Sequence, residues 1–271
     1  MTVVAALIVP GSPLPRVAAS NPPWGALAGA LETAGKRLAA VAPDTLVIYS
    51  TQWLAVLDQL WLTRAHMHGE HVDDNWHEYG ALAYDIRIDT ALTGAILGAT
   101  PSMGVRSKGV DYDGFPLDTG TIVASGFLNA AGRCPLVVAS NNLYHDWQTT
   151  EGLGRVAAEQ AAALGRRVAV IGVGGLSGSF FRETIDPATD RIASPEEDAW
   201  NQRMLALATS GKVDEFRALC PDYARAARVD MGFKHCAFVM GALGWRFSGA
   251  TVHGYGPFYG AGGAVIEFAL G

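Results

Sequence analysis

The sequence predicts an α/β fold in a single domain, residues 1–271, with a central, mostly parallel or mixed sheet flanked by helices. Short apolar runs rich in β-branched residues alternate along the chain with segments of helical periodicity. Glycine accounts for 32 of the 271 residues and follows several of these runs, as turns at strand ends require. No repeat or linker interrupts this order, so one large domain with a sizeable core is expected.

The first elements set the direction of the sheet. Val3–Val9 is an apolar run that ends in a Pro-Gly-Ser turn, and residues 24–41 carry apolar side chains at helical spacing. Residues 45–50 form the next apolar run. A strand–helix–strand order gives parallel strands joined by a right-handed crossover. Gly11 and Gln52, just past the two strand ends, are therefore expected side by side on one edge of the sheet.

The remaining elements continue the alternation. Further strands are expected at 57–65, 84–88, 135–140, 167–173, 246–254 and 263–268. Helices are expected at 90–97, 119–131 and 149–164, with consecutive helices over 195–243. The segments 66–77 and 110–118 are polar and predict loops.

Charge and cysteine content exclude several classes of function. The chain has 20 basic and 26 acidic residues, a net charge of −6, which does not favour nucleic-acid binding. Its 3 cysteines show no paired spacing, which favours a reducing compartment. The first apolar run has no basic leader and is too short to span a bilayer. The expectation is a cytoplasmic protein without a membrane partner.

Two glycine- or serine-rich motifs do not match known catalytic patterns. Residues 172–178 read G-x-G-x-x-x-G, one residue longer than the dinucleotide-binding fingerprint, and no ribose-binding acid follows at the required distance. Residues 175–179 do not have the spacing of a nucleophile elbow. His235 and Cys236 are adjacent on an expected helix, where neighbouring side chains point apart. None of these motifs predicts an active site.

Several strand-end segments together identify a family. They are Pro10-Gly-Ser-Pro, 50–53, 118–121, 140–142, 175–178, 254–256 and 262–267. In these segments the chain resembles the class III extradiol ring-cleaving dioxygenases, and the resemblance extends over nearly its whole length. Within that family the chain is most similar to the smaller subunit of the two-subunit aminophenol-cleaving members. The resemblance implies the family's α/β fold.

The resemblance also implies that this chain lacks the family's metal site. Members of the family hold a non-haem Fe(II) with two histidines and a carboxylate. The matching positions here are Gly11, Gln52 and Asp230, and the position of an acid/base histidine is Gly178. Glycine has no ligand atom, and a glutamine amide binds iron poorly. The resemblance therefore implies no metal ion and no catalytic residue in this chain, with Fe(II) in a partner subunit.

The expected function follows from that loss. The resemblance implies a non-metal-binding subunit that stabilises a homologous, iron-bearing partner, in an assembly expected to be α₂β₂. The complex would open an aminophenol or catechol-type ring with O₂. Candidate contacts with the partner are Trp53, Trp61, Trp76 and the histidine-rich loop, because aromatic residues are enriched at interfaces.

Two other functions remain open at the level of sequence. The chain could itself be a metal-dependent dioxygenase or hydrolase, because neutral imidazoles beside carboxylates can bind a divalent metal. The groups available for this are His66, His68, Glu70, His71, Asp73, Asp74 and His77. Alternatively, the chain could be a regulatory subunit that binds a small molecule in the vacated pocket. The side chains expected to line such a pocket are Ser12, Tyr112, Asp118, His145, Asp230 and His235.

Overall fold

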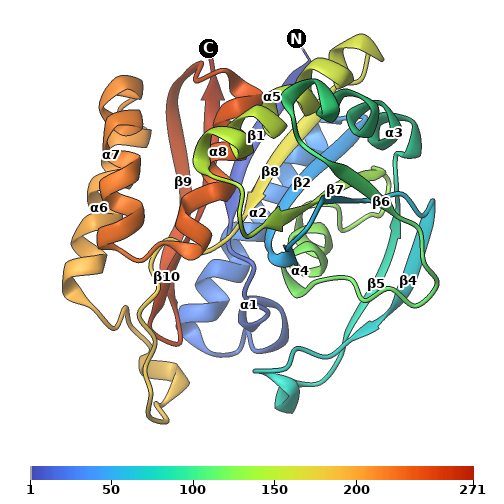
Figure 1. The fold of residues 1–271 in the computed structure, drawn as a ribbon. Helices are drawn as coiled ribbons and strands as arrows, with labels where there is room; N and C mark the ends of the chain where they lie inside the picture. Colours follow the sequence, from blue (N-terminus) through green and yellow to red (C-terminus); the bar gives the residue numbers. More distant parts are fainter. Residues whose placement is uncertain (1) are drawn as a thin grey trace.

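The computed structural model describes residues 2–271 and confirms the predicted α/β class (Figure 1). Eight strands form one mixed sheet in the order β6-β3-β7-β2-β8-β1-β10-β9, and β4 and β5 form a separate hairpin. The strands of the main sheet are β1 Val3–Val9, β2 Thr45–Ala55, β3 Gln59–Leu62, β6 Ser107–Val110, β7 Leu136–Asn142, β8 Val168–Val173, β9 Phe247–Phe258 and β10 Ala261–Leu270. The hairpin consists of β4 His66–His71 and β5 Leu82–Arg87.

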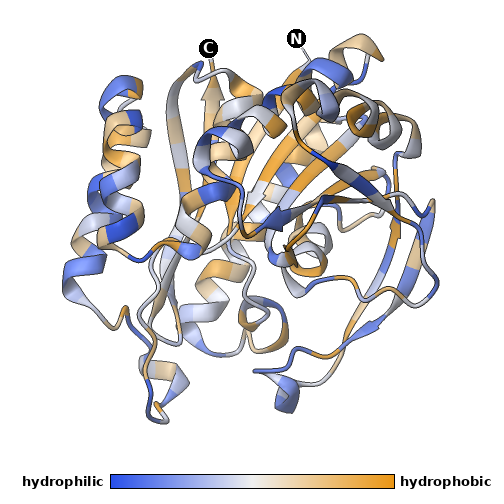
Figure 2. Ribbon diagram, viewed as in Figure 1, coloured by the Kyte–Doolittle hydropathy of each residue, from blue (hydrophilic) through white to orange (hydrophobic). Residues whose placement is uncertain are grey.

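The middle of the sheet is parallel. β7, β2, β8 and β1 run in one direction, whereas β3 is antiparallel to β7 and β10 is antiparallel to β1. All residues of β7 and β8 are buried, as expected for strands covered on both faces. Figure 2 shows much of these central strands in orange, the hydrophobic end of the scale, whereas the polar end of β7 is blue. Their carboxyl ends consequently lie together on one edge of the sheet.

Helices cover both faces of the sheet. The helices are α1 Leu14–Val17, α2 Pro22–Val41, α3 Thr90–Ala99, α4 Thr119–Leu128, α5 Trp147–Ala163, α6 Pro195–Thr209, α7 Val213–Ala226 and α8 Lys234–Leu243. One core lies between the sheet and α2, α4 and the hairpin. The other lies between the sheet and α3, α5 and α8, and it continues to α6 and α7 beside β9.

Side-chain caps explain where several of these helices begin. Asp89, Asp118 and Asp146 each precede a helix and accept a hydrogen bond from a backbone N–H in its first turn. Ser194 caps α6 in the same way, and Pro195 follows at the first helical position. These caps satisfy backbone donors that would otherwise lack a partner.

Helices α5 and α8 pack unusually close together, and glycines make this contact possible. A Cβ at Gly154 of α5 would lie 1.9 Å from the carbonyl oxygen of Phe238 in α8. A Cβ at Gly241 of α8 would lie 1.8 Å from the carbonyl oxygen of Glu151 in α5. Both distances are far below van der Waals contact, so the two backbones meet where neither helix carries a side chain.

The structure corrects several predicted elements. The expected strand at 57–65 ends at Leu62, and the expected polar loop at 66–77 begins with strand β4. In β4 only Met67 is buried, so the exposed histidines on either side concealed the strand. Strand β6 was not predicted, and the helical region 195–243 divides into three helices. The helix expected at 119–131 ends at Leu128.

The tryptophans proposed as partner contacts are mostly internal. Trp61 is 0% exposed and Trp53 is 7% exposed, so the prediction that they contact a partner is wrong. Both side chains belong to the hydrophobic core, where burial of their large aromatic surface stabilises the fold. Trp76 is partly exposed and lies in the segment that connects β4 to β5.

The cysteines form no disulfide: Cys220 and Cys236 are buried free thiols, and Cys134 is partly buried. None of the helices in residues 2–271 combines the length and the apolar composition that crossing a bilayer demands.

Candidate functional site

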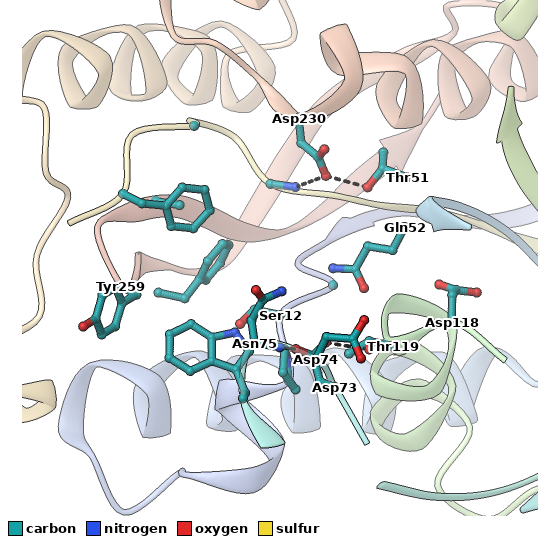
Figure 3. Close-up of a pocket in the computed structure, with 18 of the residues that line it drawn as sticks. Ser12, Thr51, Gln52, Asp73, Asp74, Asn75, Asp118, Thr119, Asp230 and Tyr259 are labelled. Atoms are coloured by element: carbon teal, nitrogen blue, oxygen red, sulfur yellow. Dashed lines mark hydrogen bonds between the residues drawn. The ribbon is translucent and has the colours of Figure 1, made fainter. Parts of the chain in front are cut away.

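A cleft of about 1100 Å³ opens at the carboxyl ends of β1, β2 and β8 (Figure 3). The start of α4, the segment after β4, the turn before α8 and the β9–β10 turn supply the rest of its lining. Open α/β sheets bind their ligands at this edge, because loops diverge there and leave a crevice. The position and size of the cleft make it the candidate functional site.

Strand β2 changes its pairing where it reaches the cleft. Its register with β7 shifts between Tyr49 and Leu54, so the intervening residues leave the regular ladder. The Gln52 side chain is exposed there, and a Cβ at Gly11 would lie 2.9 Å from its Nε2 atom. Gly11 and Gln52 are therefore close together as expected, although β8 separates their strands in the sheet.

Asp230 connects two strand ends across the cleft. It begins a 3₁₀ turn, Asp230–Phe233, directly before α8. Its Oδ2 atom accepts a hydrogen bond from the Thr51 hydroxyl at 2.5 Å and from the Gly175 backbone N–H at 3.3 Å (Figure 3). Burial raises the pKa of the Asp230 carboxyl, and these two hydrogen bonds counteract part of the increase. Only neutral donors bind this carboxyl.

A second network fastens the β4–β5 hairpin to the start of α4. Asp118 caps α4 and accepts a hydrogen bond from the Ser50 hydroxyl at 2.5 Å. The next residue, Thr119, donates its hydroxyl to Asp73 at 2.7 Å, and its oxygen lies 2.8 Å from His71 Nε2. Asp73 and His71 belong to the hairpin side of the cleft. The network therefore holds the hairpin segment in place along the cleft.

Aromatic side chains form another part of the lining: Trp76, Phe180, Phe181, Phe258 and Tyr259. The buried carboxylate of Asp190 positions the Tyr259 part of this wall. It accepts hydrogen bonds from the backbone N–H groups of Tyr259 at 2.5 Å and Gly260 at 3.0 Å, and from the Trp24 indole at 2.9 Å. Sequence reasoning missed Asp190, because it stands in a polar segment with no motif around it.

Gly178 lies on the cleft where a backbone carbonyl fills the space beside it. A Cβ at this position would lie 2.4 Å from the carbonyl oxygen of Arg228, which itself has a left-handed φ of 49°. The Arg228 guanidinium pairs with Glu197 at 2.6 Å, so its positive charge is already compensated. The structure therefore requires glycine at 178 as long as the Arg228 backbone keeps this conformation.

The site residues named from the sequence divide into two groups. The residues that line the cleft are Gly11, Ser12, Gln52, Asp118, Gly178 and Asp230. Tyr112, His145 and His235 are not among the residues that line this cleft. Tyr112 is 71% exposed, and His145 is a partly buried residue beyond the end of β7. His235 is fully buried against Gly174, behind the strand end rather than in the cleft.

The histidine-rich segment does not assemble a metal site. His66 pairs with Asp85 across the hairpin at 2.7 Å, and the His66 and His68 rings lie 5.3 Å apart. His71 instead turns to Thr119. Within residues 2–271, no group of three or more histidine, cysteine, aspartate or glutamate side chains is placed to hold a metal ion. The geometry gives no support to the histidine loop as a metal centre.

The residues of the cleft also do not fit the iron that the family resemblance implies. Gly11 offers no ligand atom, and Gln52 offers an amide in place of an imidazole. The Asp230 carboxyl is engaged by Thr51 and Gly175. A facial set of two imidazoles and one carboxylate cannot be formed from these groups, so no catalytic step through iron is derived for this chain.

Comparisons with known proteins agree with the fold and identify relatives of the chain. The model of the family "Catalytic LigB subunit of aromatic ring-opening dioxygenase" matches residues 14–269. The chain is 48% identical over 271 residues, all of both chains, to a 2-aminophenol 1,6-dioxygenase alpha subunit of a Pseudomonas species. It is 25% identical over 258 residues to the beta subunit of such an enzyme, also from Pseudomonas, covering 91% of this chain and 85% of that one.

A solved structure shares the fold at low sequence identity. It is an uncharacterized protein of Escherichia coli K12, with a TM-score of 0.66 and 13% identity. The match covers 97% of this chain and 99% of the other. This likeness concerns the arrangement of strands and helices alone.

Proposed function

Because the chain belongs to the LigB family of aromatic ring-opening dioxygenase subunits, which are class III extradiol dioxygenases, we propose that it is the non-iron-binding subunit of a two-subunit extradiol dioxygenase. One observation carries this proposal. The chain keeps the strand-end cleft of an α/β enzyme, but the residues at the matching positions are Gly11, Gln52 and Asp230, which do not make up a set of iron ligands. Fold and catalytic site are separable, so the framework can persist without the chemistry.

The proposed partner is a homologous subunit that holds Fe(II). Two relatives of this chain are named as the alpha and beta subunits of 2-aminophenol 1,6-dioxygenase, and the chain is more similar to the alpha subunit. We infer that the complex opens an aminophenol or catechol-type ring with O₂, and that this chain stabilises the catalytic subunit in an α₂β₂ assembly. We place this assembly in the cytoplasm, since the cysteines are free thiols.

The test compares the isolated chain with the complex. We expect the chain expressed alone to bind no stoichiometric iron and to leave 2-aminophenol unchanged in air. Co-expressed with an iron-bearing homologue, it should elute with that subunit in gel filtration, and the complex should contain iron and open the ring. The Asp230→Asn variant should give a complex with the same iron content. Stoichiometric iron together with ring cleavage in the isolated chain contradicts the proposal.

An exposed apolar patch supports a partner on the same edge of the sheet. The patch consists of Leu54, Val56, Leu57, Leu143 and Tyr144, which are 49%, 51%, 78%, 43% and 79% exposed. Leu54 lies at the end of β2 and the other four follow β2 or the neighbouring β7, where the Leu143 N–H donates to the Ala55 carbonyl at 2.9 Å. Contiguous exposed apolar side chains are typical of protein–protein contacts. We propose that the iron-bearing subunit covers this patch.

Replacing Leu57 with aspartate should weaken the complex by about tenfold or more, because a buried unpaired charge at an interface costs more than about 1.4 kcal/mol. The dissociation constant can be measured by titrating the labelled iron-bearing subunit with the variant. Leu164→Asp, at the end of α5, introduces the same change on another surface and should not weaken the complex. Equal dissociation constants for wild type and Leu57→Asp would exclude this patch as the contact.

A further inference from the structure

The cleft carries negative charge that the chain itself does not neutralise. The carboxylates of Asp73, Asp74, Glu78 and Asp118 all belong to its lining. None of them forms an ion pair with a lysine, arginine or histidine of residues 2–271. Asp73 and Asp118 are bound only by neutral hydroxyl and backbone N–H donors. The potential in the cleft is therefore negative, and the concave shape of the cleft strengthens it.

Two carboxyl groups of the cleft also have unused acceptor atoms. Asp118 Oδ2 is closed off from solvent and has no hydrogen-bond partner in the described part of the chain. Asp230 is partly buried, and both of its hydrogen bonds go to Oδ2, which leaves Oδ1 without a partner among residues 2–271. When a carboxylate oxygen is surrounded by protein and accepts no hydrogen bond, water screens its negative charge only weakly. Of these two oxygens only Asp230 Oδ1 is open to the cleft, so it is the one that can accept a hydrogen bond from a ligand.

The aromatic wall faces the same space. The ring centroids of Trp76 and Tyr259 lie 5.1 Å apart, and Figure 3 shows Tyr259 at the end of the cleft opposite Asp118. The face of Phe181 already accepts a cation, because the Arg191 guanidinium lies 5.1 Å from its centroid. Aromatic faces attract organic cations through their negative quadrupole. The one arginine of the lining, Arg228, is paired with Glu197 and does not compete for these rings.

We propose that the cleft binds a small organic cation, an ammonium group attached to an aromatic or aliphatic body. The body of the molecule packs against Trp76 and Tyr259. Its ammonium group lies near the carboxylates of Asp73 and Asp74. A cleft of about 1100 Å³ is large enough for such a molecule. Asn75 and Gln52 add amide groups that can orient a polar substituent (Figure 3). This site depends on the cleft of this chain and does not require the proposed assembly.

Calorimetric titration of the full chain with benzylammonium, near pH 7.5, tests the site. Benzyl alcohol has the same ring without the charge, and benzoate has the opposite charge. We expect saturable binding of benzylammonium that is about tenfold or more tighter than binding of benzyl alcohol, and no binding of benzoate. Benzyl alcohol or benzoate binding as tightly as benzylammonium would overturn the proposal. So would the absence of saturable heat up to about 10 mM benzylammonium.

Variants locate the binding in the cleft. The pair Asp74→Asn and Glu78→Gln should weaken benzylammonium binding by about tenfold, and Trp76→Ala should weaken it by a similar factor. Asp74 and Glu78 are exposed, so circular dichroism should show an unchanged fold. Glu159→Gln, an exposed residue of α5, removes a charge elsewhere and should leave the affinity unchanged. The proposal would also be overturned if all the cleft variants bound benzylammonium as tightly as the wild type. None of these outcomes affects the test of the proposed function, which measures the iron content of the two-subunit complex.

Discussion

Replacing Gly241 with alanine should lower the free energy of unfolding by about 3 kcal/mol or more. The added methyl group would lie 1.8 Å from the Glu151 carbonyl oxygen, and only a separation of α5 and α8 can relieve that overlap. Moving the two helices apart opens the packing of both against the sheet. Gly154→Ala should act in the same direction, because its methyl group would lie 1.9 Å from the Phe238 carbonyl oxygen.

A matched substitution separates this overlap from the helix propensity of alanine. Gly29 lies within α2, and no atom lies within 4 Å of a Cβ built there. Gly29→Ala should therefore stabilise the protein by about 0.5–1 kcal/mol. Urea unfolding of the wild type and the three variants gives the comparison. The explanation fails if Gly241→Ala and Gly29→Ala change the free energy of unfolding in the same direction.

Acid should destabilise the protein strongly through His235. Burial lowers the pKa of this histidine from 6.5 to about 3, and neither ring nitrogen has a hydrogen-bond partner among residues 2–271. Below pH 6.5 the unfolded chain binds a proton that the folded chain excludes, so the free energy of unfolding decreases as the pH falls. The loss approaches about 1.4 kcal/mol per pH unit, and it amounts to about 2 kcal/mol between pH 7.5 and pH 5.

The His235→Leu variant removes this titration without removing a hydrogen bond. Urea unfolding between about pH 5 and pH 7.5 should show a free energy that falls about 2 kcal/mol less for the variant than for the wild type. Carboxyl groups titrate equally in both proteins, so the difference isolates His235. His77→Leu, at an exposed position, should follow the wild-type pH dependence. Parallel curves for the wild type and His235→Leu would refute the explanation.

Much of the fold could be predicted because the central strands are recognisable in the sequence as short apolar runs. β1 and β8 are apolar throughout and β7 is apolar as far as Ala139, as expected for strands covered on both faces, and the predicted runs match them within a few residues. The β4–β5 hairpin has a weaker signal, since one face of it is exposed and carries histidines. Its burial comes from packing Met67, Leu82 and Ile86 into the core, which is a tertiary contact.

The candidate site was predictable where it follows strand ends and unpredictable where it depends on tertiary contacts. Gly11 and Gln52 were placed side by side at the sheet edge by chain order, whereas Gly178 was placed at the site by the family resemblance. The aromatic wall comes from segments around residues 76, 180 and 259, and no sequence pattern links them. His235 was expected to line a pocket, yet its ring fills the space that Gly174 leaves.

The contact between Gly178 and the Arg228 carbonyl also limits how this chain can evolve. Any side chain at 178 overlaps the backbone of a neighbouring segment, so a substitution there is harmful until that segment has first taken another path. Arg228 in turn is tied to Glu197, whose carboxylate also accepts hydrogen bonds from Ser179. Changes at several separate positions must then come together before a histidine could occupy 178. Under selection one substitution at a time, an acid/base side chain is not readily gained at this point of the cleft.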